Sequence, residues 1–201
     1  MALALSRAVL PLVLISTAQV SYAANPLEES RPLRPGSPRF VEDYRFLDDP
    51  DRASDPFDGL RYHRLSDSAW LQLGAEARYR ADVLDKPFFG LRGIKDDSYL
   101  LQRLQVHADL HLFDDAARAF VQVENTRAFG KDLYSPSDES RNEVRQAFVD
   151  FNYNFDGGRY TTRVGRQEMG FGAQTFVTYR DAPNIRQTFD GVRASLNLRR
   201  S

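Results

Sequence analysis

Arginines and acidic residues alternate with apolar residues in several stretches of the sequence. In the clearest of these rows, Glu76, Arg78, Arg80 and Asp82 take every second position. A guanidinium group can bind a carboxylate through two parallel hydrogen bonds, a geometry that lysine does not match. Positive side chains gathered in one place also raise the local concentration of anions. The row therefore indicates electrostatic selection of anions, with the neighbouring acids weakening each contact enough for release.

The histidines give no sign of a catalytic or metal site. His107 and His111 share a strand face but lie about 14 Å apart along it, which is too far for one metal ion. Asp109 between them has no serine or cysteine partner with an activating turn nearby. We therefore expect no enzyme activity, no metal and no cofactor, with a hydrolase as a distant alternative.

The elements that position these side chains follow from a period-two alternation. In the hairpin 99–125, Leu104 and Val106 take one parity while Gln105 and His107 take the other. Successive side chains of a strand point to opposite faces, so this alternation predicts strands with one apolar and one ionisable face. The pattern predicts about six strands, at residues 70–83, 99–112, 119–125, 143–153, 160–169 and 191–199.

The hairpin alone fits a secreted β-sandwich or a membrane barrel equally well, and the connections separate the two. Long connections at 85–98, 129–141 and 171–188 alternate with short ones at 113–117 and 154–159. Outer-membrane barrels have short periplasmic turns and longer outside loops, whereas Greek-key sandwiches have no reason to alternate this way. Aromatic residues also gather at the predicted strand ends. The predicted fold class is all-β, an antiparallel transmembrane β-barrel.

The composition is consistent with this class. The 201 residues carry a formal charge of −1, which argues against a nucleic-acid partner. Aromatic residues make up 12% of the chain while the mean hydropathy is −0.51, as expected for a barrel with aromatic girdles and a polar interior. The chain has no cysteine, which excludes a disulfide scaffold and thiol chemistry.

Residues 1–23 have the features of a secretory signal peptide. Arg7 supplies the basic region, Ala8–Ile15 is an apolar core, and small residues precede a predicted cut after Ala23. The alternative is an N-terminal membrane anchor, but the apolar run is short for a membrane span. The mature chain is therefore expected in the cell envelope.

Residues 24–69 are predicted to form a periplasmic leader. The stretch 25–38 is rich in Pro, Glu and Arg and is typical of a flexible segment. The aspartates of 48–58 lack the spacing of a calcium loop and are interpreted as a series of Asp-Pro turns. Tyr44 and Phe46 are expected to anchor this segment beneath the barrel part, residues 70–201.

Three stretches resemble the alginate export family of outer-membrane proteins. They are the hairpin 99–125, the segment 142–151 followed by Arg163-Val164-Gly165-Arg166-Gln167-Glu168, and Arg180-Asp181-Ala182-Pro183-Asn184 with Thr188-Phe189-Asp190-Gly191-Val192. The resemblance runs from about Pro35 to about Leu198 and rests on the order and spacing of these stretches together.

The resemblance implies a monomeric, eighteen-stranded barrel in the bacterial outer membrane, whose charged lumen passes an alginate-like polyuronate. A barrel needs at least about eight strands, so the predicted strands are interpreted as the N-terminal part of a longer barrel. The implied partners are an anionic saccharide and outer-membrane lipid. General or nutrient-uptake porins with a mixed-charge lumen, plugged structural barrels and outer-membrane hydrolases stay open as alternatives.

The candidate pore-lining residues are those of the ionisable parity together with residues that the resemblance points to. They are Arg78, Arg80, Arg103, Arg145, Gln146, Asp150, Arg163, Arg166 and Gln167. Arg145 and Arg166 fall on the apolar parity of their strands, where burial in lipid near the midplane would cost roughly 2–4 kcal/mol. We therefore expect each of them either at a rim or turned inward by a β-bulge.

Overall fold

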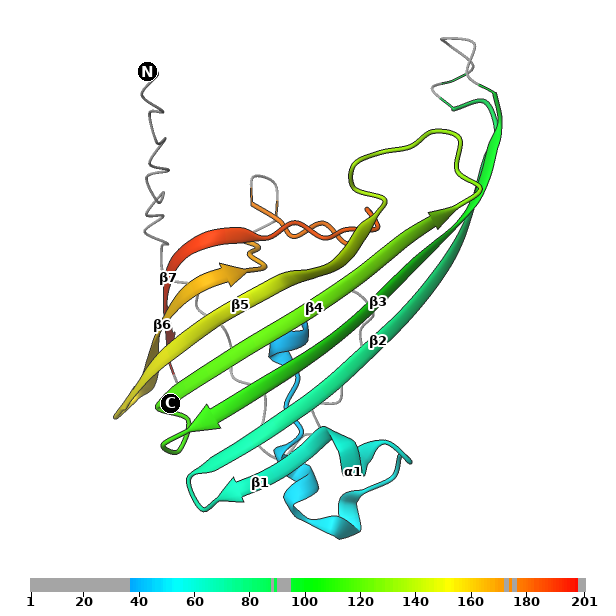
Figure 1. Cartoon of the computed structure of the whole chain (residues 1–201). Helices are drawn as coiled ribbons and strands as arrows, with labels where there is room; N and C mark the ends of the chain where they lie inside the picture. Colours follow the sequence, from blue (N-terminus) through cyan, green and yellow to red (C-terminus); the bar gives the residue numbers. More distant parts are fainter. Residues whose placement is uncertain (1–36, 88, 90–94, 172–173, 175–176, 199–201) are drawn as a thin grey trace, which may run out of the picture.

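Figure 1 shows the computed structural model of the chain, which describes residues 37–87, 89, 95–171, 174 and 177–198. Its regular secondary structure is mostly β-strand. Its strands are β1 (Tyr62–Ser66), β2 (Ala69–Leu84), β3 (Asp97–Leu112), β4 (Ala117–Phe129), β5 (Ser140–Phe155), β6 (Gly158–Gln167) and β7 (Phe189–Leu198). The short helices η1 (Arg39–Val41), η2 (Arg45–Asp48), η3 (Pro50–Arg52) and α1 (Asp58–Arg61) come before them.

The strands form one antiparallel sheet in sequence order, from β1 to β7. Figure 1 shows this sheet as strongly curved and twisted, with no second sheet packed against it among the described residues. The prediction of a single curved antiparallel sheet is therefore confirmed, and a sandwich is excluded for this part of the chain. The six predicted strands correspond to β2 through β7, each within a few residues of its predicted bounds.

The strand β1 was not predicted from the sequence. It lies inside the stretch assigned to the leader and pairs with the start of β2, with Tyr62 opposite Gln72 and Arg64 opposite Trp70. Its five residues show no clean alternation, and the register shifts before Ser66. A short irregular strand at a sheet edge is stabilised by its pairing partner, which sequence periodicity does not reveal.

The alternation of connection lengths is reproduced in space. The connections β1–β2, β3–β4 and β5–β6 are short, and those of β2–β3, β4–β5 and β6–β7 are long. Figure 1 shows the short turns at the lower end of the sheet and the long connections at the upper end. The sheet therefore has a turn end and a loop end, as the barrel prediction requires.

Burial in this sheet is inverted relative to a water-soluble protein. On the polar parity, Gln105 and Gln122 are 1% and 0% exposed, while Val106 and Phe151 on the apolar parity are 57% and 58% exposed. Soluble sheets bury the apolar face and leave the polar face in water. The inversion is what a transmembrane barrel shows, with apolar side chains outward and polar ones inward. We call the buried polar surface the inner face.

A segment before β1 covers part of the inner face, and we call residues 37–48 the inner segment. The backbone N–H of Tyr44 donates to the side chain of Gln72 at 2.6 Å, and Arg118 donates to the carbonyl oxygen of Phe40 at 2.5 Å. Arg39 forms an ion pair with Glu76 of β2. Tyr44, one of the two expected anchors, is only 4% exposed, and Phe40 contacts aromatic rings of the sheet.

Two predictions from the sequence fall on residues outside the described part. The signal peptide 1–23 and the beginning of the leader, residues 24–36, are not among the residues that the structure describes. Within the described residues, no helix has the length and apolar character needed to cross a membrane.

Candidate functional site

A ladder of arginine–carboxylate pairs crosses the inner face in the half nearer the short turns. Arg163 of β6 donates to both carboxylate oxygens of Asp150 on β5, at 2.7 and 2.8 Å. Arg118 of β4 makes the same two-pronged contact with Asp109 of β3, at 2.7 and 2.6 Å, and lies 3.6 Å from Asp150. Strand pairing explains this ladder, because Asp150 stands directly opposite both arginines and Asp109 lies diagonal to Arg118 across the sheet.

Aromatic rings reinforce the ladder. Phe40 of the inner segment packs edge-on against Phe120 and Phe148, with ring centroids 6.2 and 5.6 Å apart. The guanidinium of Arg163 lies over the rings of Phe148 and Phe40 at 3.7 and 4.2 Å. Stacking of guanidinium on aromatic faces stabilises a buried cation in addition to its ion pair. The inner segment and the arginine ladder therefore hold each other in place.

The ladder continues to the turn end through the β3–β4 turn. Asp115 of that turn accepts hydrogen bonds from His111 at 2.5 Å and from Arg159 at 2.6 Å. Burial alone would raise the pKa of Asp115, but these two donors outweigh it and hold the pKa below its usual range. Asp115 is therefore ionised and joins β3, β4 and β6 at the turn end.

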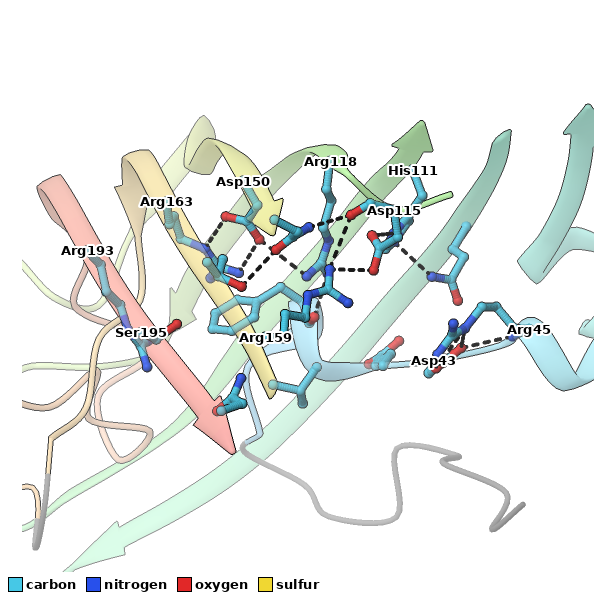
Figure 2. Close-up of a pocket in the computed structure, with 17 residues that line it drawn as sticks. Asp43, Arg45, His111, Asp115, Arg118, Asp150, Arg159, Arg163, Arg193 and Ser195 are labelled. Atoms are coloured by element: carbon cyan, nitrogen blue, oxygen red, sulfur yellow. Dashed lines mark hydrogen bonds and ion pairs between the residues drawn. The ribbon is translucent and has the colours of Figure 1, made fainter. Parts of the chain in front are cut away.

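A cavity of about 340 Å³ lies between the inner segment and the sheet. Figure 2 shows Asp43 and Arg45 of the inner segment on one side and arginines of the sheet on the other. Its lining contains five arginines and four carboxylates: Arg45, Arg118, Arg159, Arg163, Arg193, Glu42, Asp43, Asp115 and Asp150. Hydroxyl and amide groups of Thr161, Ser195, Asn152 and Asn197 complete it. Such a lining offers hydrogen bonds to sugar hydroxyls and charges to ionic groups.

Three predicted arginines converge on the β6–β7 connection near the loop end. Arg103 donates to the carboxylate of Asp181 at 2.8 Å, and Arg78 donates to the backbone carbonyl of Asp181 at 3.1 Å. Arg80 donates to the carbonyl of Ala182 at 2.6 Å. Residues separated by about a hundred positions in the sequence therefore share one partner, the dipeptide Asp181-Ala182.

The two predicted glutamines lie on the inner face in a fully buried layer. Gln146 donates to Gln122 at 2.5 Å and accepts the backbone N–H of Glu168 at 3.0 Å. Gln167 is 0% exposed, and its amide faces the carbonyls of Gly165 and Gly191 at 3.4 Å. The Gln146 side chain is occupied by protein partners and supports the start of the β6–β7 connection, whereas Oε1 of Gln167 is buried without a hydrogen-bond partner among the described residues.

Arg145 turns inward through a β-bulge. The register of β4 and β5 shifts between Gln122, which faces Gln146, and Val123, which faces Val144, so Arg145 is an extra residue on β5. Its side chain is only 13% exposed, and its Nε lies 3.2 Å from the carboxylate of Glu124. The bulge thus places the Arg145 side chain on the inner face, although its position in the sequence falls on the apolar parity. A bulge was one of the two placements expected from the sequence.

Arg166 was a candidate pore-lining residue, but it does not turn inward and takes the rim position that was the other expectation for it. It stays on the outward parity of β6 and forms a two-pronged ion pair with Asp190 of β7, at 2.8 and 3.0 Å. The side chains are 48% and 68% exposed. No bulge interrupts the β6–β7 register, in which Arg166 and Asp190 are direct neighbours, so nothing turns Arg166 inward. The pair lies near the loop end of both strands, where a rim position is compatible with charge.

A family model for alginate export matches residues 69–200, which is well over half of the chain. The chain belongs to the alginate export family. Its members are outer-membrane channels that export polysaccharide, a transport family rather than an enzyme family. The matched region begins at the first residue of β2 and includes every long strand of the sheet. No curated protein and no solved structure matches this chain.

Several inner-face residues of this alginate export family protein were not predicted from the sequence. Arg118 shares the parity of Gln122 and Glu124, so extending the alternation back from Gln122 by four positions would have found it. Asp181 and Arg186 lie in a connection without periodicity, and only the folding of that connection onto the sheet brings them to the site.

The described residues contain no group of three or more His, Asp or Glu side chains that could hold a metal ion. His107 is instead buried and stacked on Phe120 at 5.5 Å, with Glu42 of the inner segment 3.6 Å from its Nε2. Gly74, its cross-strand neighbour, makes room for the ring, since an added Cβ would clash with the imidazole of His107. The histidine therefore has a packing role in this structure.

Proposed function

We propose that this protein is a channel for an anionic polysaccharide of the polyuronate type, with arginines of the inner face providing the selectivity. The observation that supports it best is the inner face itself, where guanidinium groups repeatedly hold carboxylates in two-pronged contacts. A polyuronate carries one carboxylate per sugar and can exchange with such contacts along its path.

Buried donors on the inner face support the same proposal. Nη1 of Arg163, and Nε and Nη1 of Arg103, have no hydrogen-bond acceptor among the described residues. A buried donor without an acceptor is unfavourable, so a ligand oxygen that reaches it gains more than it would in water. Carboxylate and hydroxyl oxygens of a uronate provide such acceptors.

The proposal includes closure of the barrel by further strands. In the described sheet, β1 pairs only with β2 and β7 only with β6, which leaves one edge of each strand unpaired. Unpaired backbone groups cost several kcal/mol each in lipid, so a membrane-spanning sheet must close. We propose a monomeric closed barrel in contact with outer-membrane lipid, as the family resemblance implies.

The test is the ion preference of the complete barrel in planar bilayers. Replacing Arg78→Glu together with Arg80→Glu should shift the reversal potential toward cations and weaken block by oligouronate, because two inner-face cations become anions. The control is Arg166→Glu, which makes the same kind of substitution at one position on the outward face. Unchanged reversal potential and unchanged block in the double variant would refute arginine selectivity.

The pairing of the arginines favours one alternative, a porin with a mixed-charge lumen. Arg118 and Arg163 already hold Asp109 and Asp150, so much of the inner positive charge is compensated. If the protein is such a porin, Arg78→Glu with Arg80→Glu should change ion preference only slightly. Neutral sugars and uronates should then permeate alike. Comparing block by glucose and by glucuronate on the same channels separates the two functions.

A further inference from the structure

The carboxylate of Asp181 stands among three guanidinium groups on the inner face. Its Oδ1 lies 2.8 Å from Nη2 of Arg103 and 3.5 Å from Nε of Arg186, and both its oxygens lie 3.4 Å from Nη1 of Arg78. The three arginines come from β2, β3 and the β6–β7 connection. This one carboxylate therefore contacts cations from three separate parts of the chain, of which Arg103 also lies 3.6 Å from Glu76 and Arg186 lies 3.4 Å from Glu168.

Two backbone carbonyls at Asp181 and Ala182 also accept hydrogen bonds from arginines of the inner face. The carbonyl of Asp181 accepts from Arg78 at 3.1 Å, and the carbonyl of Ala182 accepts from Arg80 at 2.6 Å. One carboxylate and two adjacent neutral oxygens are also what a uronic acid presents, as its carboxylate and neighbouring hydroxyl or ring oxygens. The dipeptide Asp181-Ala182 thus offers the arginines the same chemical groups as one sugar unit of a polyuronate.

Burial differs sharply between the arginines and the group that they hold. The side chains of Arg103 and Arg186 are each 1% exposed, whereas that of Asp181 is 36% exposed. Two nitrogens of Arg103 also lack an acceptor in the described part of the chain. Arg103 and Arg186 are therefore part of the wall, whereas Arg78, at 23%, and the carboxylate of Asp181 are partly exposed.

The β6–β7 connection is anchored to the rest of the protein close to Asp181, through Asn184. The amide of Asn184 donates to the carbonyls of Gln102, Arg127 and Asp138, at 3.0, 3.3 and 2.8 Å. Asn184 is 3% exposed, so this anchor is part of the wall. Asp181 lies three residues from this anchor, so its release from the arginines would not require the anchor to be released.

From this geometry we infer that Arg78, Arg80, Arg103 and Arg186 form a subsite for one uronate unit, and that Asp181 occupies it until substrate arrives. The inference rests on the proposed function and adds the location and regulation of a binding step. A tethered competitor lowers the apparent affinity by the fraction of time that the subsite is open. It also prevents the subsite from trapping the polymer, since Asp181 rebinds as each carboxylate leaves.

The test compares Asp181→Asn with Asp181→Glu in the complete barrel in planar bilayers, with sodium glucuronate as the blocking ligand. Asp181→Asn keeps the shape but removes the competing charge, and should strengthen glucuronate block by roughly tenfold. Asp181→Glu keeps the charge, so its block should equal that of the unaltered protein. The matched control is Asp190→Asn, which removes an equal charge from the outward face and should change nothing.

Glucose, which lacks the carboxylate, should block all four proteins equally and weakly. If glucuronate blocks Asp181→Asn no more strongly than the unaltered protein, Asp181 is not a competitor and the inference is overturned. A second neutral variant, Asp181→Ser, replaces the asparagine variant in this comparison if that variant does not assemble. Failure of the proposed function is distinguishable, because then Arg78→Glu with Arg80→Glu also leaves ion preference unchanged.

Discussion

At the scale of residues, the protein replaces an apolar core with paired charges. Arg163 with Asp150, and Arg118 with Asp109, are buried pairs in which both carboxylate oxygens accept a hydrogen bond. A buried charge without a partner costs several kcal/mol, so each pair depends on its partner being present. In these two pairs the charges of the arginine and the aspartate compensate each other.

Glu168 gives a pH-dependent prediction at this scale. It lies just after β6, and burial raises its pKa to about 7 even though Arg186 stands 3.4 Å away and opposes the shift. Glu124 raises the pKa further, while Arg103 and Arg39 lower it. The folded protein therefore holds a proton that the unfolded chain, with the ordinary pKa of 4.5, has lost. Stability from this group is complete below about pH 4.5 and falls as the pH rises toward about 7.

We expect Glu168→Gln to flatten the change in thermal midpoint between about pH 4.5 and pH 7, because the amide stays neutral throughout. The measurement is thermal unfolding in detergent across that range. Glu143→Gln is the control, since the Glu143 side chain is 61% exposed. An unaltered pH slope in Glu168→Gln would show that another group causes it.

At the scale of elements, two irregular features place the site. The bulge on β5 turns Arg145 toward Glu124, and the inner segment carries Phe40 against the rings of Phe120 and Phe148. Both depart from regular strand geometry, and both bring a side chain to the inner face. The regular strands form the barrel wall, and the bulge on β5 and the inner segment place further side chains on its inner face.

The variant Phe40→Ala should release the inner segment from the sheet. The loss of a large buried ring costs roughly 3–5 kcal/mol in full cores, and less is expected here because Phe40 is only half-buried. Limited proteolysis should cleave the stretch 37–61 faster in this variant, with the sheet intact. Val41→Ala is the matched control, since Val41 is the next residue and is 55% exposed. Equal cleavage rates would mean that Phe40 does not hold the segment.

At the scale of the whole molecule, the inverted burial assigns the two faces of the sheet. The outward valines Val106 and Val121 are 57% and 41% exposed, whereas their inward neighbours Gln105 and Gln122 are 1% and 0% exposed. In water such a surface would be an aggregation hazard, and in a bilayer it is the favourable surface. The long connections and the short turns then lie on opposite sides of the membrane.

Arginine on the outward face should block membrane insertion. Val106→Arg or Val149→Arg places a charge near the middle of the apolar band, at a cost of roughly 2–4 kcal/mol. Ser195→Arg is the control, because Ser195 lines the inner cavity. The folded fraction in lipid vesicles, followed by the gel shift on heating, should fall for the two valine variants only. Equal folding of all three variants would remove the basis for the assignment of faces.

The sequence by itself determined the wall of this protein. Alternation is a local property, so residues such as Leu104 and Gln105 already specify a strand and the face on which each side chain lies. The lengths of the connections specified which strand ends lie together. The inward position of Arg78, Arg103 and Arg163 followed from the same parity, and the structure agrees with it.

Only the tertiary structure decided what meets at the inner face. A one-residue shift in register sends Arg145 inward, whereas uninterrupted pairing keeps Arg166 outward beside Asp190, and parity alone treats the two alike. Asp181 reaches Arg78 across about a hundred residues, through a connection that has no periodic pattern. Contacts of this kind depend on long-range packing and on bulges, whose free energies come from partners distant in the sequence.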